Sequence, residues 1–339
     1  MTHRVTLIVS RYQTGHWLLR DDLLKDNISS ISAEALRKSG PSIIKEYEMA
    51  IAFSDMLFHT DEREVLEMVL ASFGGPIGIV DDRDDPVVLK LASLPNVVYF
   101  KREYRYMPQG AISSIGYWLS WMHLARRLGS ERLLSPTREH LLRNRGKILP
   151  LPLTVSNSIP SNTGGLHRGD KVYSVSMIAN MNLPNNLRDL LASGMSSSKR
   201  LKLARLLMAV PGSYIHLYNY DNPKLGYRLQ PTAYASVIAS SVSSVAPKGS
   251  GGDTYRYYEI PALGSVLLSE RPSVVIPNDF SDRREALFFR NHGQLLNIIN
   301  ELSSDRKMAS SIAKAGYEKY QRYHTPAMRL KYLLDHLSR

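Results

Sequence analysis

The sequence predicts an α/β protein with two domains of similar size, each built on a parallel sheet. Short apolar runs rich in β-branched residues alternate with helical patterns along both halves of the chain, which is typical of parallel strands joined by crossover helices. The length of 339 residues suits two domains of roughly 150 residues each. Residues 146–163 combine a short apolar strand with Pro, Ser and Asn, and this composition indicates a connection between domains.

The N-terminal half shows this alternation clearly. Apolar runs at residues 5–9, 75–80 and 96–100 predict buried strands. Residues 62–73 carry apolar side chains at helical spacing. The run at residues 5–9 is too short for the apolar core of a secretory signal, and no stretch approaches the roughly 20 apolar residues of a membrane span. We therefore expect a cytoplasmic protein.

The same alternation starts again after residue 163. Residues 199–209 form a helical pattern, and residues 233–240 read as helical or extended. Two long helical patterns close the chain, at residues 283–302 and 305–323. Strands are predicted between these segments, at residues 172–179, 214–218, 242–246, 265–268 and 274–276.

The composition excludes some kinds of chemistry and favours some kinds of partner. The absence of cysteine excludes disulfides, thiolate metal sites and cysteine nucleophiles. The net charge is +12; residues 1–160 hold 20 Lys and Arg against 18 Asp and Glu, and residues 161–339 hold the remaining 23 against 13. A basic surface of this kind attracts nucleic acid, anionic lipid or phosphorylated small molecules. An ordinary solvated surface with excess cations is the other interpretation.

A glycine-rich turn, PKGSGGDTYRYYEIPALG, follows the predicted strand at residues 242–246. Gly251 and Gly252 allow the backbone to approach a ligand closely, and Asp253 or Thr254 suits the cap of a helix that starts there. A helix N-terminus offers unpaired N–H groups and the positive end of the helix dipole. This turn is therefore a candidate phosphate site.

Three charged side chains accompany the turn. Lys248 and Arg256 would add positive charge for a phosphate, and Glu259 lies on the same helical face as Arg256. A carboxylate there could accept hydrogen bonds from the two hydroxyl groups of a ribose. The alternative is a structural turn into a core helix, with Arg256 and Glu259 as a weak ion pair. Spacing alone leaves both open, and the pattern is neither a Walker loop nor a GxGxxG fingerprint.

Residues 247–268 resemble the nucleotide-sugar-binding segment of GT-B glycosyltransferases of the exostosin-like and spore-maturation (CgeB-like) type. Upstream, YSVSMIANMNLPNNLRDLL (residues 173–191) is similar to the strand, loop and helix that open their C-terminal domain. The segment YFKREYRY (residues 99–106) is similar to a late part of their N-terminal domain. Downstream, YEKYQRYHTPAMRLKYLL (residues 317–334) looks like their C-terminal tail. The likeness extends over about residues 97–335.

The resemblance implies two Rossmann-like domains facing a cleft, with a C-terminal helix packing back toward the N-terminal domain. Residues 1–155 would form the acceptor domain, residues 156–322 the donor domain and residues 323–339 the returning helix. The implied activity is that of a hexosyl- or pentosyltransferase, which moves a sugar from a nucleoside diphosphate sugar, UDP-sugars first, to a hydroxyl acceptor. Enzymes of this fold often work without a bound metal, so no metal and no further cofactor are expected.

The resemblance also assigns roles on the donor side. Arg256 would contact the diphosphate, Glu259 the nucleotide ribose, and the backbone from Gly251 to Thr254 the phosphates. The sequence departs from the usual pattern at Ala179 and Asn180, where family members generally have a glycine after the strand.

Sugar transfer also needs a base for the acceptor hydroxyl, expected at the carboxyl ends of the N-terminal strands. The sequence GIVDDRDDP places four aspartates directly after the predicted strand at residues 75–80. Asp82 is the first candidate and Asp81 the second, whereas a metal-binding cluster or a solvated turn are the other interpretations. His16, in RYQTGHW after the first strand, is a further candidate unless it only caps or packs.

The sequence leaves the acceptor open. The basic charge favours a polyanion, with hydroxymethylated DNA and a surface polysaccharide as two versions. Two rivals belong to other classes: a noncatalytic nucleotide-binding or assembly module of the same fold, and a nucleotide-sugar epimerase. The base and sugar of the donor, the stereochemical outcome and the oligomeric state do not follow from the residues.

Overall fold

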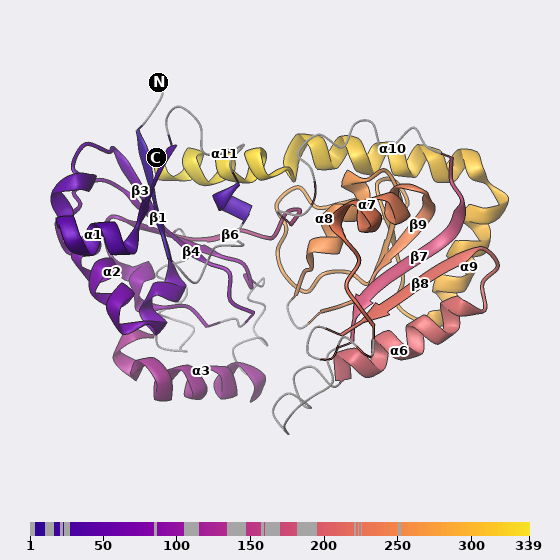
Figure 1. The fold of residues 1–339 in the computed structure, drawn as a ribbon, viewed down its shortest axis with the longest axis horizontal. Coiled ribbons are helices and arrows are strands. Elements are labelled where there is room, and N and C mark those ends of the chain that lie inside the picture. The colour runs from indigo at the N-terminus through magenta and orange to yellow at the C-terminus, as the bar shows by residue number, and fades with distance from the viewer. Residues whose placement is uncertain are drawn as a thin grey trace. The chain divides into compact units, whose positions relative to one another are not determined.

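The fold is seen in a computed structural model of the chain (Figure 1). The structure describes residues 4–10, 17–20, 23, 28–84, 87–104, 115–133, 147–156, 159, 170–181, 195–219, 222, 224, 226–249 and 252–339. The chain divides into two compact units. The N-terminal unit consists of Met1–Pro152, Val274–Pro277 and Pro326–Arg339, and the C-terminal unit of Leu153–Ser273 and Asn278–Thr325.

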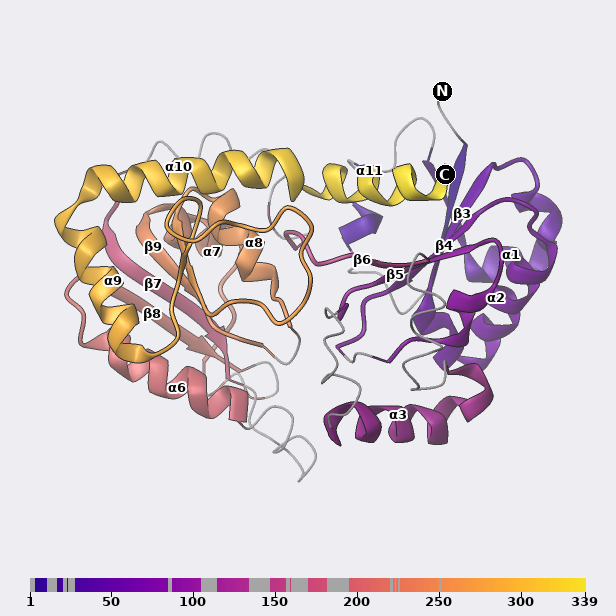
Figure 2. The same ribbon diagram turned by 180° about the vertical axis from the view of Figure 1, so that it is seen from behind.

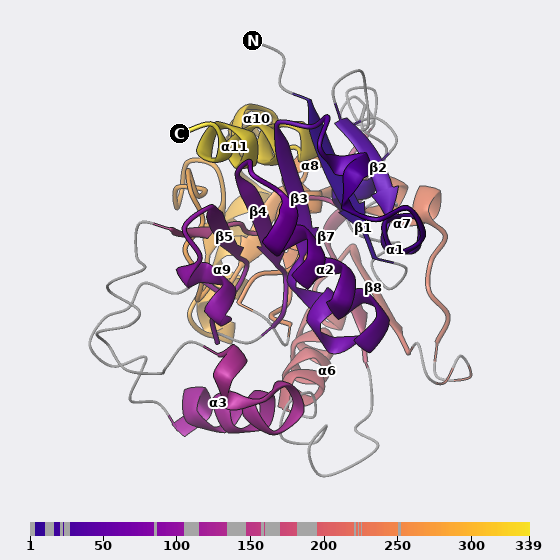
Figure 3. The ribbon, with the colours of Figure 1, turned by 90° about the vertical axis from the view of Figure 1, so that its left-hand side faces the viewer.

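The N-terminal unit is built on a six-stranded sheet whose paired strands are all parallel (Figure 3). The strand order is β2-β1-β3-β4-β5-β6. The order reverses at β1, because β2 and β3 pair with opposite edges of that strand. The strands are β1 (Val5–Val9), β2 (Ile28–Ser32), β3 (Met49–Phe53), β4 (Ile77–Asp81), β5 (Val97–Lys101) and β6 (Ile148–Pro150).

Three helices contribute to the apolar cluster on one face of this sheet. They are α1 (Ala33–Ser39), α2 (Thr60–Ser72) and α3 (Ile115–Leu128). Ser32 caps α1 by accepting a hydrogen bond from the backbone N–H of Ala35 at 3.1 Å. In α2, buried apolar residues recur on one side of the helix, which matches the helical spacing in the sequence.

The C-terminal helix α11 (Pro326–Leu337) belongs to the N-terminal unit and contributes to a second apolar cluster with its strands. Leu330, Leu333 and Leu337 are the buried apolar residues of α11 in this cluster. Gly78 in β4 leaves space for the helix, because a Cβ there would lie 3.1 Å from Cδ1 of Leu337. The prediction that this helix packs on the N-terminal domain is therefore confirmed.

The C-terminal unit has a five-stranded sheet, again with parallel pairing throughout (Figure 2). Its strand order is β11-β10-β9-β7-β8. The chain runs from β7 to β8 on one side and then to β9 on the other, so the order reverses at β7. The strands are β7 (Tyr173–Asn180), β8 (Ser213–Tyr218), β9 (Ser241–Ala246), β10 (Val266–Ser269) and β11 (Leu287–Phe288).

Helices surround this second sheet as well. Buried side chains of α6, α9 and α10 join the strands in one apolar cluster, and α7 and α8 contact β9. The helices are α6 (Met195–Met208), α7 (Pro231–Ala239), α8 (Tyr255–Ala262), α9 (His292–Ser304) and α10 (Arg306–Tyr323). Each unit is therefore a Rossmann-like parallel α/β domain, as the sequence predicts. None of the described helices combines the length and apolarity that crossing a bilayer requires.

Two predictions about local structure are wrong. Residues 274–276 form no strand; instead the backbone N–H of Val275 donates to the carbonyl of Tyr104 at 2.8 Å within the N-terminal unit. The helix predicted from residue 283 begins only at His292, because Asn291 caps it by accepting from Gln294 N–H at 2.9 Å. Part of the intervening apolar stretch is β11 instead.

Candidate functional site

A pocket of about 130 Å³ lies in the C-terminal unit at the carboxyl ends of its strands. Tyr218 is the last residue of β8, Ile178 lies near the end of β7, and Arg256 and Glu259 come from α8, which follows β9. The strand order reverses at β7, and such a reversal is where open α/β sheets bind ligands. The other lining residues are Ser156, Arg228, Leu229, Pro231, Tyr234 and Tyr255.

The predicted turn from β9 into α8 is present. Helix α8 has Thr254 as its N-cap, in extended conformation with φ −141° and ψ 155°, and the Thr254 side chain makes no capping hydrogen bond. The helix ends at Ala262, and Gly264 beyond it has a φ of 74°, which glycine adopts without strain. The short helix thus presents residues from its first two turns to the pocket.

Arg256 is a cation without a carboxylate partner in the part of the chain that the structure describes. Its Nη2 donates to the hydroxyl of Tyr218 at 3.0 Å, whereas its Nε is buried and has no hydrogen-bond partner there. Burial by itself would lower the pKa of Arg256, but Tyr234, Tyr218 and Glu259 raise that pKa above its usual value. The guanidinium therefore stays charged and has an unused donor.

Arg200 on α6 is a second cation at this place. Its Nη1 donates to the carbonyl of Asn180 at 2.6 Å, and its Nε to the carbonyl of Lys248 at 3.2 Å. Burial and the charge of nearby Arg256 lower the pKa of Arg200. Two neighbouring guanidinium groups repel each other, and a bound anion would relieve this repulsion. In the sequence, nothing distinguishes Arg200 from the other basic residues of α6.

Glu259 is buried and already accepts hydrogen bonds from the protein. Its Oε1 accepts from the backbone N–H of Ser156 at 3.3 Å and from the Ser156 hydroxyl at 2.6 Å. Its Oε2 accepts from the Tyr234 hydroxyl at 2.5 Å. A carboxylate has about four acceptor positions, so about one position on Oε2 remains for a ligand. The described contacts include no ion pair between Arg256 and Glu259, so that alternative interpretation is not supported.

The other predicted donor-side residues have different surroundings. Asp253 is buried, and its Oδ2 accepts from the Leu153 N–H at 2.9 Å and the Tyr258 hydroxyl at 3.1 Å. It therefore fixes the turn from within. Gly252 is buried in the turn, where its carbonyl accepts from Ser273 N–H at 3.2 Å. Lys248 has an exposed side chain, and Gly251 lies outside the described residues.

In the N-terminal unit, the fully buried Asp81 is the centre of a charge network. Arg83 donates through Nε to Oδ1 at 2.8 Å and through Nη2 to Oδ2 at 2.7 Å. Lys101 Nζ donates to Oδ2 at 3.0 Å, and the Tyr99 hydroxyl also donates to Oδ2. Burial would raise the pKa of Asp81, but the charges of Arg83 and Lys101 outweigh it and hold that pKa well below its usual value. This carboxylate is poorly suited to accept a proton.

Asp82 has the opposite electrostatic environment. Its side chain is partly buried, and burial together with the negative charges of Asp55 and Asp81 raises its pKa from 3.8 to about 6. Asp55 follows β3 and Asp82 follows β4, and these two strands are neighbours in the sheet. Asp81 and Asp82 are adjacent in the sequence, and only their environments in the fold give them different pKa values. Asp82 is the one whose protonation changes near neutral pH.

Two further predictions concern His16 and metal ions. His16 lies outside the described residues. Among the residues that are described, no group of three His, Asp or Glu side chains is arranged to hold a metal ion.

Residues 199–335, from α6 to α11, match a family of glycosyl transferase-like proteins. No curated protein sequence matches the chain. An α-glucosyltransferase solved in complex with UDP and a 13-mer DNA containing a HMU base is similar over 100% of both chains, with 10% identity and a TM-score of 0.57.

A second structure, described as α-glucosyltransferase (AGT) in complex with UDP, covers 99% of this chain and is itself covered completely, with 9% identity and a TM-score of 0.56. At such low identity the likeness shows the fold. The two parallel α/β units are therefore the domains of a GT-B fold, and residues 199–335 are similar to glycosyl transferase-like proteins.

Proposed function

We propose that this chain transfers a sugar from a nucleoside diphosphate sugar, with UDP as the nucleotide, to a hydroxyl acceptor. The observation that carries the proposal is the pair of guanidinium groups, Arg200 and Arg256, beside a pocket at the strand reversal of the C-terminal unit. A diphosphate would neutralise both cations. The match of residues 199–335 to glycosyl transferase-like proteins supports this choice of ligand.

In this proposal the diphosphate and the ribose of the donor lie at the pocket. The diphosphate contacts Arg256 and Arg200, which stabilise the charge that develops on the leaving nucleoside diphosphate. The buried Nε of Arg256 gains the partner that it lacks among the described residues. A ribose hydroxyl donates to the remaining acceptor position of Glu259. The pocket volume of about 130 Å³ is smaller than the roughly 300–1,000 Å³ of a typical ligand site, so it holds part of the nucleotide rather than all of it.

Asp82 is our proposed base for the acceptor hydroxyl. A pKa of about 6 leaves the carboxylate ionised at neutral pH while making it more basic than an ordinary aspartate, which favours proton removal. Asp81 is the weaker candidate, because its oxygens are already engaged by Arg83, Lys101 and Tyr99.

For the acceptor we propose hydroxymethylated DNA. The basic C-terminal half carries 23 Lys and Arg against 13 Asp and Glu, and DNA binding draws most of its affinity from such charges. The similar α-glucosyltransferase whose complex contains UDP and DNA is consistent with this choice. A surface polysaccharide is the alternative acceptor. In that case the polysaccharide would receive the sugar and DNA would not.

The donor site is tested by titration calorimetry with UDP. Arg256→Gln and Arg200→Gln each remove a charged donor, and a charge-assisted hydrogen bond is worth about 1.5–3 kcal/mol, so we expect affinity to fall by about 10-fold or more. Arg205→Gln is the matched control, because Arg205 lies exposed on the same helix as Arg200, which is the residue affected by the charge of Arg256. Equal UDP affinity in Arg200→Gln, Arg256→Gln and Arg205→Gln would refute the donor site.

Activity separates the proposed function from its rivals. The chain is incubated with a panel of UDP-sugars, with and without hydroxymethylated DNA, and UDP release and sugar transfer are measured. Acceptor-dependent release with modified DNA supports the proposal. Turnover of the sugar without any acceptor would indicate an epimerase, and UDP binding without turnover would indicate a binding module.

A further inference from the structure

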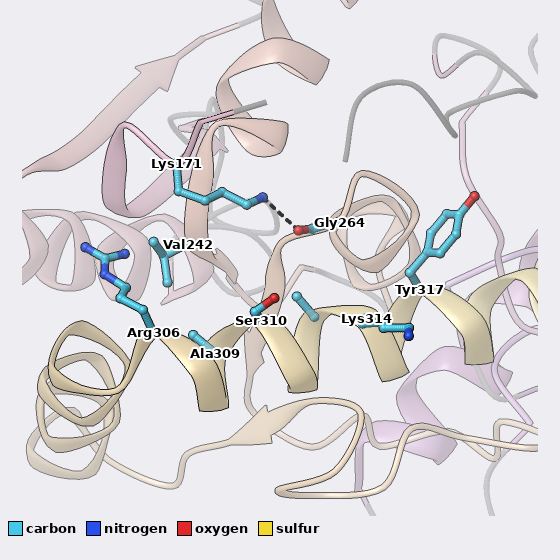
Figure 4. Close-up of a pocket in the computed structure, with 9 residues that line it drawn as sticks. Lys171, Val242, Gly264, Arg306, Ala309, Ser310, Lys314 and Tyr317 are labelled. Carbon is cyan, nitrogen blue, oxygen red and sulfur yellow. Dashed lines mark hydrogen bonds between the residues drawn. The ribbon is translucent and has the colours of Figure 1, made fainter. Parts of the chain in front are cut away.

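A second pocket, of about 570 Å³, lies at the other end of the C-terminal sheet (Figure 4). Its lining includes Lys171, which precedes β7, Val242 at the start of β9, and Gly264, which precedes β10. Because these strands are parallel, all three residues mark their amino ends. The proposed donor pocket lies at the carboxyl ends, so the two pockets are separate sites of the same unit. The volume falls in the range of roughly 300–1,000 Å³ typical of ligand sites.

Helix α10 forms one wall of this pocket. Figure 4 shows Arg306, Ser310, Lys314 and Tyr317 along the helix, with Lys171 approaching from the side of the sheet. Val242, Ala309 and Ala313 add apolar surface to the lining. The lining therefore combines an apolar floor with an aromatic ring and several polar side chains.

The charge of the lining is entirely positive. Lys171, Arg306 and Lys314 are cations, and no described residue that lines the pocket is acidic. Lys314 lies 4.0 Å from Glu318 in an exposed ion pair. Neither Lys171 nor Arg306 has a carboxylate partner among the residues that the structure describes. Two unpaired cations at one cavity favour an anion there.

Lys171 is held with its ammonium group in a fixed place. Its Nζ donates to the carbonyls of Ala239 at 2.6 Å and Gly264 at 2.8 Å. An ammonium group has three donors, so one remains for a ligand. Burial lowers the pKa of Lys171 to about 8, which leaves the group mostly charged at pH 7. The charge is therefore present and already positioned before any ligand arrives.

We propose that this pocket binds a small amphipathic anion. The ligand has one carboxylate or phosphate group that meets Lys171, and the exposed Arg306 adds longer-range attraction. Its apolar body lies on Val242, Ala309 and Ala313. A plain inorganic anion leaves the apolar floor exposed, and a neutral apolar molecule leaves the cations unpaired, so both groups are needed for binding.

The test uses the full chain and three probes: octanoate, octyl phosphate and inorganic phosphate. Titration calorimetry should detect one octanoate or octyl phosphate per chain, with a Kd near or below about 1 mM. Comparison of the first two probes tells which headgroup the site prefers. Inorganic phosphate should bind at least about 10-fold more weakly, because it lacks the apolar body. Equal affinity for phosphate and octyl phosphate would overturn the assignment.

Two pairs of variants locate the binding. Ser310→Tyr should weaken octanoate binding by at least about 10-fold because its ring would occupy part of the pocket, whereas Ser311→Tyr should preserve it, since Ser311 is exposed on α10 and does not line the pocket. Arg306→Gln should weaken binding by about threefold to fivefold, the range for an exposed charge. Lys307→Gln, which makes the same change at the exposed neighbouring residue, should alter it by less than about twofold.

Two outcomes would refute the site. One is octanoate binding to Ser310→Tyr as tightly as to Ser311→Tyr. The other is displacement of octanoate by UDP, which would place the probe in the donor pocket. Failure of UDP to bind at all would refute the proposed function and leave this site intact.

Discussion

Asp81 and Asp82 are neighbours in the sequence, and we predict that their replacement by asparagine changes stability in opposite directions. Asp82→Asn should stabilise the N-terminal unit above pH 6. Asp81→Asn should destabilise the same unit at every pH near neutral. Asparagine has nearly the same shape as aspartate, so the comparison isolates the charge.

The magnitude for Asp82 follows from its pKa, which rises from 3.8 to about 6 in the folded chain. At about 1.4 kcal/mol per pKa unit, the ionised carboxylate costs the fold up to about 3 kcal/mol. Between pH 3.8 and 6 the folded chain holds a proton that the unfolded chain has released, so stability falls as pH rises through this window. Asp82→Asn removes that cost. The variant should therefore gain up to about 3 kcal/mol at pH 7.5 and much less at pH 4.5.

The magnitude for Asp81 follows from its partners. Replacing this carboxylate leaves Arg83 and Lys101 without the anion that neutralises both, and breaking a buried charge pair costs about 3–5 kcal/mol. Arg83 also donates from Nη2 to the carbonyl of Val87 at 2.9 Å, which supports the loop after β4. Asp81→Asn should loosen that loop as well.

Urea denaturation followed by tryptophan fluorescence measures both effects. The chain has three tryptophans, Trp17, Trp118 and Trp121, and all belong to the N-terminal unit, so their emission reports on the unit that contains both aspartates. Asp84→Asn, at an exposed position that pairs with Arg102, is the control and should change stability by less than about 1 kcal/mol. Loss of stability in Asp82→Asn at pH 7.5, or a change that does not depend on pH, would refute the reasoning.

Other predictions concern activity, packing and the acceptor. If Asp82 is the base, the transfer rate should rise as pH rises through about 6 and then level off, because the carboxylate must be ionised. Asp82→Asn should lower the transfer rate by about 10²-fold to 10⁴-fold. A transfer rate that stays constant between pH 5 and 7 would exclude Asp82 as the base. Gly316→Ala should cost about 1–3 kcal/mol in circular dichroism melts, because its Cβ would lie 2.5 Å from the carbonyl of Glu285. Gly293→Ala in α9, where the nearest atom is 3.5 Å away, should instead stabilise by up to about 1 kcal/mol. Affinity for hydroxymethylated DNA should fall at least about 10-fold between roughly 50 and 200 mM salt in fluorescence anisotropy, and a flat response would argue against a DNA acceptor.

The sequence predicts strands and helix starts well where the residue types present suit only one kind of local structure. Apolar runs of five or six residues predict β1, β4 and β5, because buried parallel strands need nearly continuous apolar sequence. The glycines before Thr254 predict the start of α8. By contrast, β2 has the sequence ISSIS with exposed serines at the edge of the sheet, and nothing in its pattern distinguishes it from a loop.

The candidate site depends on contacts that no spacing reveals. Arg200 resembles the other basic residues of α6 in sequence, and only the fold brings it near Arg256. Asp81 and Asp82 differ because Asp81 is the last residue of β4 and pairs with Lys101 across the register of β5. Glu259 is the reverse case: its position was predicted, but the engagement of its oxygens by Ser156 and Tyr234 was not.

The assignment of α11 to the N-terminal unit has a consequence for synthesis on the ribosome. The strands of that unit are translated before the C-terminal unit, but the helix that buries Leu330, Leu333 and Leu337 against them is translated after it. Until then the apolar surface around Phe53 and Phe100 lacks its native cover, and exposed surface of this kind promotes aggregation of nascent chains. A chain that stops before Pro326 should therefore expose this surface permanently and should aggregate more readily than one that includes the helix.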